Sequence, residues 1–414
     1  MLREDLIAWL KYECPPGRCQ PARQENGFSQ RNCVDMNLIS CMLALTIAAT
    51  PSAQTWLKDA EICNGWYNSW DAASISRMEN MPFVVAPHPI TEATIGKVHK
   101  VGARVLLYVT FYQMPPDEYY QHAKVSEHPD WICIHSDGTE GVSTLHSDRV
   151  TLCPNSPGFR EYALKTTKLI MAKGADGLFI DNGDPDLNCE GPKFGRHKHI
   201  YPGKDNTYAY RKLLEEIRAE VKKHGEDKIV IVNPGAPFQA WVGACDGQML
   251  ESYICSWAWD NRWEERKILK MREIYGPLAE KGDAVVTLST VGHTKNPVRE
   301  DAYYCYAWSR LSGFIWADWF TGKDAAGELY RLRIGIPIGP MKTCDGYFMR
   351  EFERGLVVVS SQEKGASFKI SAKDHPRALD IFNAVRLKPG PSGDYEITLP
   401  PGAGRVYMMM TPGS

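Results

Sequence analysis

Several features that would assign this chain to a familiar class are absent from its sequence. Its 414 residues carry 48 lysines and arginines against 50 aspartates and glutamates, giving a formal net charge of -2, and there is no long basic run. Nucleic-acid-binding proteins usually carry a basic patch, so we expect no nucleic acid as the main partner. Neither a G-x-S-x-G nucleophile elbow nor an H-E-x-x-H motif is present, which argues against two common hydrolase classes.

Metal-ligand motifs are also scarce, although the chain contains 12 cysteines. Four of these lie early in the chain, at Cys14, Cys19, Cys33 and Cys41. No His-x-His partner follows them at zinc-finger spacing, so we expect no zinc site there. His197 and His199 alternate with basic residues in GRHKHIY, and we interpret them as loop surface rather than as ligands. We expect no metal ion and no cofactor.

The composition indicates a globular protein with a large core. Hydrophobic residues make up 43% of the chain and charged residues 24%, which argues against extended disorder. The length predicts two domains. The chain also carries 12 tryptophans and 19 tyrosines, a rich supply of aromatic side chains.

The amino-terminal part differs in amino-acid composition from the rest of the chain. Residues 1–35 are polar, contain proline and are irregular, so we interpret them as an upstream extension with the true start near Met36. Leu38–Ala49 is apolar and is followed by small residues, as in a secretory signal peptide. It is too short to span a bilayer. We therefore expect a signal-peptide-like segment over residues 36–53, no membrane span, and a secreted or periplasmic protein; a buried core helix is the alternative.

From Gln54 onward, strand and helix signals alternate. Short apolar runs predict eight parallel strands over Ile62–Ser69, Pro82–Pro87, Arg104–Phe111, Gly177–Asp181, Lys228–Asn233, Gln248–Ile254, Ala284–Ser289 and Gly313–Trp319. One intervening helix starts at Ser156 and stops at Gly174, and another is capped by Asp205 or Asn206. This pattern predicts an α/β fold, a (β/α)8 TIM barrel over residues 54–338. A doubly wound sheet is the runner-up, but no G-x-G-x-x-G loop follows the first strand.

After Gly339 the helical period disappears. Short strands are predicted over Tyr347–Phe352, Leu356–Ser361, Ser367–Ile370, Tyr395–Leu399 and Arg405–Met410. Glycine, proline and aspartate separate these strands, as in KPGPSGD and PPGAG. This pattern predicts a small antiparallel β-sandwich over residues 339–414.

Two acidic residues stand out at the ends of predicted barrel strands, where the active sites of such barrels lie. Asp181 ends the fourth strand in GADGLFIDN, and Glu251 interrupts the sixth in QMLESY. An acid beside a buried strand is costly unless it is paired or used. Glycoside hydrolysis needs two carboxyl groups flanking the scissile bond. We predict Asp181 as nucleophile or base and Glu251 as general acid/base; the alternatives are a loop cap for Asp181 and an exposed or ion-paired residue for Glu251.

Further polar and aromatic residues follow the predicted strands, and we predict that they bind substrate. They are Trp66, Trp70, Asp71, His88, Tyr112, Asn182, Asn233, Trp257, Trp259, Asp318 and Trp319. The flat faces of tryptophan suit stacking on sugar rings, with core packing as the alternative. Asp318 is also a third candidate for the acid, and its alternative is a helix cap.

GADGLFIDN resembles the fourth-strand signature of glycoside hydrolase barrels of the α-amylase and α-galactosidase type. The resemblance implies a nucleophile at Asp181 and an acid/base at Glu251. The chain more closely resembles a glycosyl hydrolase-like family of secreted barrel proteins, on VLLYVTFYQ, GADGLFIDN, MLESY and IGIPIGPM followed by YFMREFERGLVVVSS. That likeness implies a barrel followed by a β-sandwich, and an oligo- or polysaccharide substrate.

Two other functions remain open at this point. The barrel could bind a glycan through its tryptophans without turning it over. It could also be a metal-dependent hydrolase that uses the Asp181–Asp186 loop, where oxygen ligands of the kind that calcium favours are crowded together.

Overall fold

The computed structural model describes residues 55–65, 70–79, 81–87, 89–120, 122–143, 146–183, 188–251, 253–255, 262–289, 298–319 and 326–410. All of them belong to one compact unit, residues 51–414. The predicted segments 1–35 and 36–53 lie outside the described residues. Within the described part, no helix has both the length and the apolar character needed to cross a membrane.

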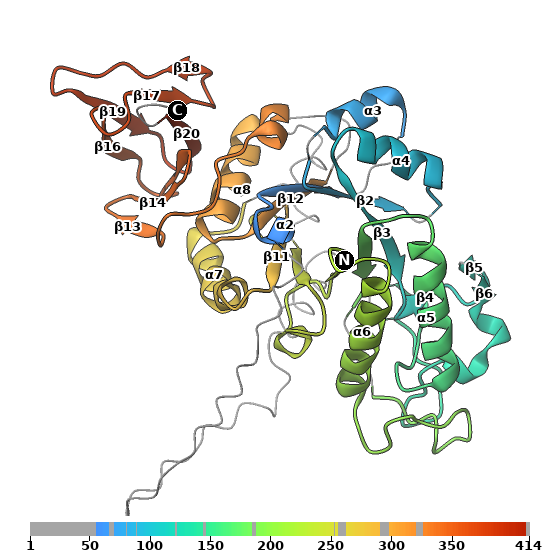
Figure 1. Ribbon diagram of the computed structural model, residues 1–414. Coiled ribbons are helices and arrows are strands. Elements are labelled where there is room, and N and C mark those ends of the chain that lie inside the picture. Colours follow the sequence, from blue (N-terminus) through green and yellow to red (C-terminus); the bar gives the residue numbers. More distant parts are fainter. Residues whose placement is uncertain are drawn as a thin grey trace, which may run out of the picture. The chain divides into compact units, whose positions relative to one another are not determined.

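Eight parallel strands close into a barrel, which confirms the predicted fold (Figure 1). In the order of the sheet they are β1 (Ile62–Gly65), β12 (Ile315–Trp319), β11 (Ala284–Ser289), β10 (Gly247–Glu251), β9 (Ile229–Val232), β8 (Gly177–Asp181), β3 (Arg104–Thr110) and β2 (Phe83–Pro87). All eight predicted strands are present, and β8 and β11 have the predicted bounds.

A short helix precedes the first barrel strand, and helices follow most of the others in the chain. They are α2 (Thr55–Lys58), α3 (Ala72–Arg77), α4 (Glu92–Lys100), α5 (Pro157–Met171), α6 (Asn206–Lys222), α7 (Glu265–Glu280) and α8 (Arg299–Leu311). The predicted caps are confirmed for two of them, because Ser156 accepts a hydrogen bond from the Phe159 amide and Asp205 from the Tyr208 amide. Between β9 and β10, where every residue is described, the chain forms only a 3-10 turn, Gln239–Trp241.

The connection between β3 and α5 carries short elements that the sequence did not predict. Strand β4 (Gln113–Met114) pairs with β7 (Val150–Thr151), and β5 (Tyr119–Tyr120) pairs with β6 (Ala123–Lys124). The 3-10 turns Val125–Glu127 and Pro129–Trp131 lie between β6 and β7 in the chain. Two-residue strands are too short to show a period of their own.

The inside of the barrel is a separate apolar core. It includes Phe179 of β8, Ile231 of β9 and Met249 of β10, all at most 1% exposed. Successive strand residues point to opposite sides of the sheet, so every second residue faces this interior. On each strand, the residue that lies two positions after the last apolar interior residue therefore also faces inward, and it stands at the carboxyl end of the barrel.

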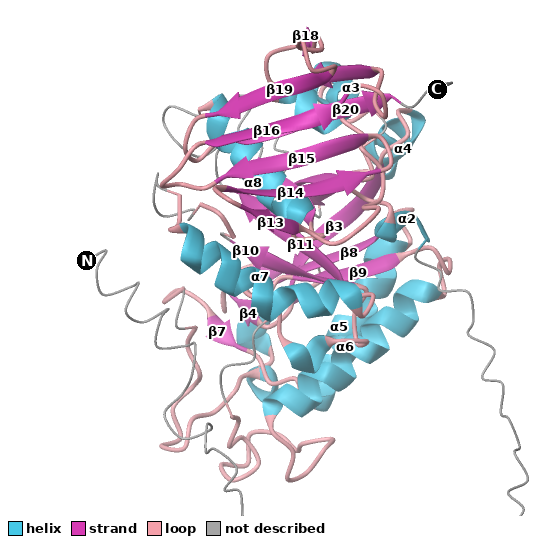
Figure 2. Cartoon of the chain, turned by 90° about the vertical axis from the view of Figure 1, so that its left-hand side faces the viewer, coloured by secondary structure: helices cyan, strands magenta, loops and turns pink. Residues whose placement is uncertain are grey.

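Antiparallel strands follow the barrel (Figure 2). One sheet has the order β13 (Lys342–Cys344), β14 (Tyr347–Phe352), β15 (Gly355–Ser360), β20 (Gly404–Met410), β17 (Arg377–Asp380) and β18 (Val385–Arg386), and a second pairs β16 (Ala366–Ser371) with β19 (Asp394–Leu399). Apolar residues from both sheets share one buried cluster. The five predicted strands are confirmed, and β13, β17 and β18 are additional.

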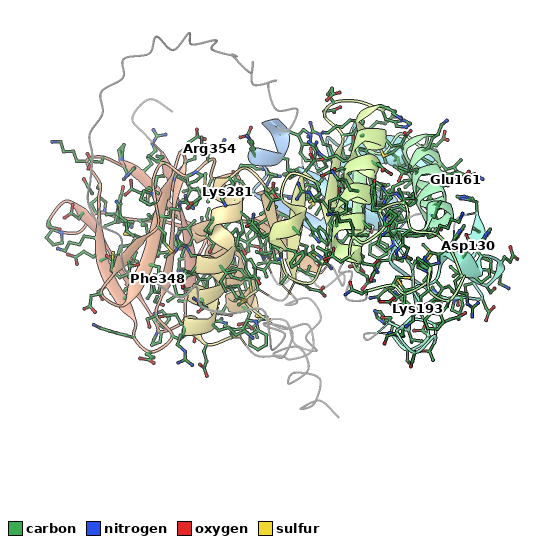
Figure 3. All side chains as sticks on the ribbon, turned by 90° about the horizontal axis from the view of Figure 1, so that it is seen from below. Asp130, Glu161, Lys193, Lys281, Phe348 and Arg354 are labelled. Atoms are coloured by element: carbon green, nitrogen blue, oxygen red, sulfur yellow. The ribbon has the colours of Figure 1, made fainter. Side chains whose placement is uncertain are left out.

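Side chains of α8 and of the antiparallel strands pack together. The Trp308 ring lies 5.0 Å from the ring of Phe348, which is labelled in Figure 3. Glu61, only 3% exposed, ties the start of β1 to the segment that leads toward β13. Its carboxylate accepts hydrogen bonds from the backbone amides of Ile334 at 2.9 Å and Gly335 at 2.6 Å.

The substitution Glu61→Ala leaves these two amides without their acceptor. Because each unsatisfied buried donor costs about 1–3 kcal/mol, we expect the free energy of unfolding to fall by about 2–4 kcal/mol. Urea unfolding measures the change. The exposed Glu79 provides the control, and an equal loss in Glu79→Ala would contradict the assignment.

Candidate active site

Three neighbouring strands each place one polar side chain at the carboxyl end of the barrel. Asp181 follows interior Phe179 by two positions on β8, and Glu251 follows Met249 in the same way on β10. Between these strands, Asn233 stands directly after β9, two positions beyond Ile231. The strand period therefore directs all three side chains toward the same region.

The side-chain amide of Asn233 joins the two acids. Its Nδ2 atom donates to Asp181 Oδ1 at 2.8 Å and to Glu251 Oε2 at 3.1 Å. Because both distances start from one nitrogen, the two carboxylate oxygens lie no more than 5.9 Å apart. The Gly235 amide donates to Asn233 Oδ1 at 2.9 Å, which fixes the orientation of the side-chain amide.

Asp181 is surrounded by hydrogen-bond donors. Its Oδ2 atom accepts from the Tyr108 hydroxyl at 2.5 Å and from Asn182 Nδ2 at 3.2 Å, in addition to the bond that Asn233 donates to Oδ1. These three hydrogen bonds fix the orientation of the Asp181 carboxyl group.

The turn after Asp181 is tightly packed against β9. Asn182 has a φ of 51°, in the left-handed region, and the Gly183 amide donates to the Asn233 carbonyl at 2.9 Å. A β-carbon at position 183 would lie 2.4 Å from Val232 Cγ1. Glycine is therefore needed for the turn to approach the neighbouring strand this closely.

Glu251 has the electrostatics of an acid that keeps its proton. Burial and, to a lesser extent, the negative charge of Asp181 raise the pKa of its carboxyl group, and the Asn233 hydrogen bond partly offsets both, so the pKa is about 7. A protonated carboxyl beside an ionised one is the arrangement that separates general acid from nucleophile in glycosidases.

The predicted substrate contacts have different outcomes. Asn182 and Asn233 lie at the acid pair. Tyr112 is instead fully buried, edge-on to Tyr210 at 5.7 Å. Asp71 caps α3 by accepting from the Ser74 amide, and Trp70 packs against the main core cluster. Tyr112, Asp71 and Trp70 thus make structural contacts, and their roles in substrate binding stay predictions.

Other predicted contacts are not described. Trp66, His88, Trp257 and Trp259 lie outside the described residues, as do Asp184 and Asp186 of the predicted metal loop. Asp318 and Trp319 end β12, but their side chains are also outside the described set.

Sequence reasoning missed two residues at this site. Tyr108 lies two positions before the end of β3, on the face that carries Thr110, and the strand period could have found it. Burial and then Arg149 lower the pKa of His146, and the charges of Asp148 and Asp181 partly offset them, so His146 lies within electrostatic reach of Asp181. It stands in an irregular loop, where no period indicates its direction.

The interpretation of His197 and His199 as loop surface needs correction. Both rings are partly buried. His197 Nε2 lies 3.5 Å from Cys189 Sγ, and His199 Nε2 lies 3.6 Å from Cys153 Sγ. These four side chains form a separate cluster in the loops that precede α5 and α6.

Residues 104–356, more than half of the chain, match the family model described as hypothetical glycosyl hydrolase family 15. The chain belongs to this family. It is accordingly a glycoside hydrolase, and its substrate class is carbohydrate. No relative among the curated proteins matches it.

Solved structures with the same fold are distant in sequence. An Anoxybacillus α-amylase has a TM-score of 0.56 at 12% identity, over 87% of this chain and all of that one. A GH27 β-L-arabinopyranosidase from Geobacillus stearothermophilus gives 0.55 at 10%, over 88% and 99%. Trehalose-6-phosphate hydrolase from Bacillus licheniformis gives 0.55 at 11%, over 86% and 100%. Identities this low show a shared fold alone.

The raised pKa of Glu251 predicts a pH-dependent difference between the wild type and Glu251→Gln. The ordinary value is 4.5 and the folded value about 7, so between these pH values only the folded state holds the proton. The wild type therefore loses stability relative to the glutamine variant as pH rises through this window. Urea unfolding of both proteins between pH 4.5 and about 7 measures the difference in their free energies of unfolding. Groups that titrate in both proteins contribute equally to the two values and cancel in the difference. Parallel stability curves would contradict the assignment.

Proposed function

We propose that this protein is a retaining glycosidase that cleaves O-glycosidic bonds, with Asp181 as nucleophile and Glu251 as general acid/base. The hydrogen bonds that Asn233 donates to both acids carry this proposal. They limit the nearest oxygens to a separation of 5.9 Å. Retaining enzymes hold their carboxyl groups about 5–5.5 Å apart, whereas inverting enzymes need about 6.5–9.5 Å to admit a water molecule.

The reaction follows from the protonation states of the two acids. Protonated Glu251 donates its proton to the glycosidic oxygen while a carboxylate oxygen of Asp181 attacks the anomeric carbon. The leaving alcohol departs and a covalent glycosyl–Asp181 ester forms. Ionised Glu251 then removes a proton from water, which attacks the same carbon and displaces Asp181. Two inversions leave the sugar with its original anomeric configuration.

Neighbouring residues support these roles. The Tyr108 hydroxyl and the Asn233 amide orient Asp181 from two sides. Ionised Asp181 in turn helps Glu251 to keep its proton. After the glycosyl ester forms, Asp181 is no longer charged, so the acidity of Glu251 rises and it can serve as the base in the second step.

The proposed substrate is an oligo- or polysaccharide. Trp257 and Trp259 follow β10, the strand that carries Glu251, and their predicted role is to stack on sugar rings beside the acid pair. We also propose that the enzyme acts outside the cytoplasm, because residues 36–53 resemble a signal peptide. Amino-terminal sequencing of the exported protein should then give a first residue near Gln54. Protein that stays in the cytoplasm with residues 1–53 still attached would contradict this.

The substitutions Asp181→Asn and Glu251→Gln test the proposal with little change in shape. On a panel of polysaccharides and aryl glycosides, we expect Asp181→Asn to abolish turnover. Glu251→Gln removes the general acid, so we expect the rate of turnover to fall by about 10²–10⁴-fold. The loss should be smaller on aryl glycosides whose leaving group needs no proton.

Asp59→Asn and Glu226→Gln are matched controls, because both residues are exposed and lie away from the carboxyl ends of the strands. Circular dichroism and urea unfolding check the fold of each variant. Full activity in folded Asp181→Asn would refute the assignment. Binding without sugar release by the wild type across the panel would favour a glycan-binding barrel instead.

A further inference from the structure

A cluster of sulfur and nitrogen ligands lies outside the proposed active site. One candidate ligand atom from each of Cys153, Cys189, His197 and His199 falls within a group whose members are all within 4.8 Å of one another. We propose that these four side chains bind a structural Zn²⁺ ion, independently of the proposed reaction. Cys153 lies shortly before α5, and the other three lie in the loop between β8 and α6.

Two sulfur–nitrogen distances within the cluster match those of a tetrahedral zinc site. The Cys189 Sγ–His197 Nε2 distance is 3.5 Å and the Cys153 Sγ–His199 Nε2 distance is 3.6 Å. Zinc bonds of about 2.3 Å to sulfur and 2.0–2.1 Å to nitrogen, at a tetrahedral angle, separate two such ligands by roughly 3.5–3.6 Å. The Cys189–His197 and Cys153–His199 pairs thus already have the sulfur–nitrogen separation that a shared ion requires.

Backbone groups around Cys189 favour a thiolate. The amides of Ile134 and Gly191 donate to Cys189 Sγ at 3.4 and 3.3 Å, as groups that surround metal-bound ligands commonly do. Gly191 also leaves room for the imidazole of His197, since a β-carbon there would lie 2.4 Å from its Cε1 atom. The loop is therefore shaped to bring this histidine against the cysteine.

The two loops that supply the ligands are joined beside the cluster. The Asn155 side chain accepts from the Tyr201 amide at 2.8 Å and donates to the Tyr201 carbonyl at 3.1 Å. The Ile200 amide donates to the Asn155 carbonyl at 3.0 Å. Cys153 lies two positions before Asn155, and His199 lies two positions before Tyr201. These contacts hold the Cys153 and His199 ligands near each other before any ion binds.

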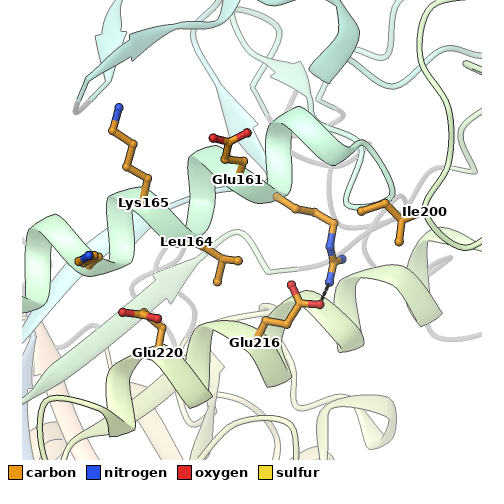
Figure 4. A pocket seen from close by; sticks show the side chains of 8 residues that line it. Glu161, Leu164, Lys165, Ile200, Glu216 and Glu220 are labelled. Carbon is orange, nitrogen blue, oxygen red and sulfur yellow. Dashed lines mark ion pairs between the residues drawn. The ribbon is translucent and has the colours of Figure 1, made fainter.

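Arg160 strengthens the same junction. It donates to the Pro154 carbonyl at 2.8 Å and to the Ala209 carbonyl of α6 at 3.0 Å. It also forms an ion pair with Glu216 of α6. Glu216 and Ile200, both labelled in Figure 4, line the groove between α5 and α6. The groove is lined by neither Asp181 nor Glu251, so this junction is separate from the acid pair.

Cys133 is a neighbour of the cluster rather than one of its four ligands. Its Sγ atom accepts from Asn206 Nδ2 at 3.4 Å. Cys133 is itself buried, and its sulfur is not among the four atoms grouped within 4.8 Å of one another.

The donor set selects zinc and a structural role. Two thiolates and two imidazoles in tetrahedral positions are typical of zinc, and four protein ligands leave no open position for substrate. The loop that supplies three ligands begins directly after the Asp181–Gly183 turn. Lys193, labelled in Figure 3, lies in this loop between Cys189 and His197. The ion would tie the loop to the segment before α5.

Metal analysis of the full chain tests the proposal. The wild type is purified under reducing conditions from zinc-supplemented cells. Inductively coupled plasma mass spectrometry should then find about one zinc ion per chain. Cys189→Ser and His199→Gln should contain less than about one tenth of that amount. Cys245→Ser is the matched control, because Cys245 is equally buried but lies outside the cluster, and it should retain its zinc.

A second measurement keeps the test decisive if a variant fails to fold. Wild-type protein treated with a chelator should melt at a lower temperature, and Zn²⁺ should restore its stability. Co²⁺ in place of zinc should give the absorption bands of a tetrahedral thiolate site. Reduced wild type that takes up neither ion would overturn the proposal, as would a Cys153–Cys189 disulfide in the purified protein. Equal zinc loss in Cys245→Ser would also overturn it.

Discussion

The hydrogen bonds from Asn233 to both acids are the constraint on which the chemistry depends. Two ionised carboxylates at this separation would repel each other, and the pair is stable because the acids differ in environment. Donors from Tyr108, Asn182 and Asn233 surround Asp181, whereas the partly buried carboxyl group of Glu251 accepts from Asn233 alone within the described part of the chain. One proton therefore has a defined place, on Glu251.

The barrel core and the acid pair arise from the same alternation. Phe179, Ile231 and Met249 fill the interior, and the polar side chains two positions further along complete the site. A register shift of one residue would turn the apolar residues outward and the acids away from each other. Selection for a packed barrel interior thus also fixes the direction of Asp181, Asn233 and Glu251.

Much of this fold could be predicted from the sequence, since short apolar runs between capped helices show a strong period. The GADGLFIDN strand pointed directly to Asp181. Tyr108 lies inside the apolar run of β3, where an aromatic side chain usually packs in the core, so the sequence did not single it out. The Cys153–His199 and Cys189–His197 contacts were hidden because the ligands come from two loops without a C-x-x-C spacing. Only the folded chain brings these loops together.

Trapping of the covalent intermediate tests the central claim most directly. A 2-deoxy-2-fluoro glycoside with an activated leaving group, built on the sugar that the enzyme releases, slows hydrolysis of the glycosyl ester more than its formation. Peptide mapping of the inactivated wild type should then locate one sugar on Asp181. A label on another residue, or steady turnover of the activated sugar with inverted configuration, would contradict the assignment of Asp181 as the nucleophile.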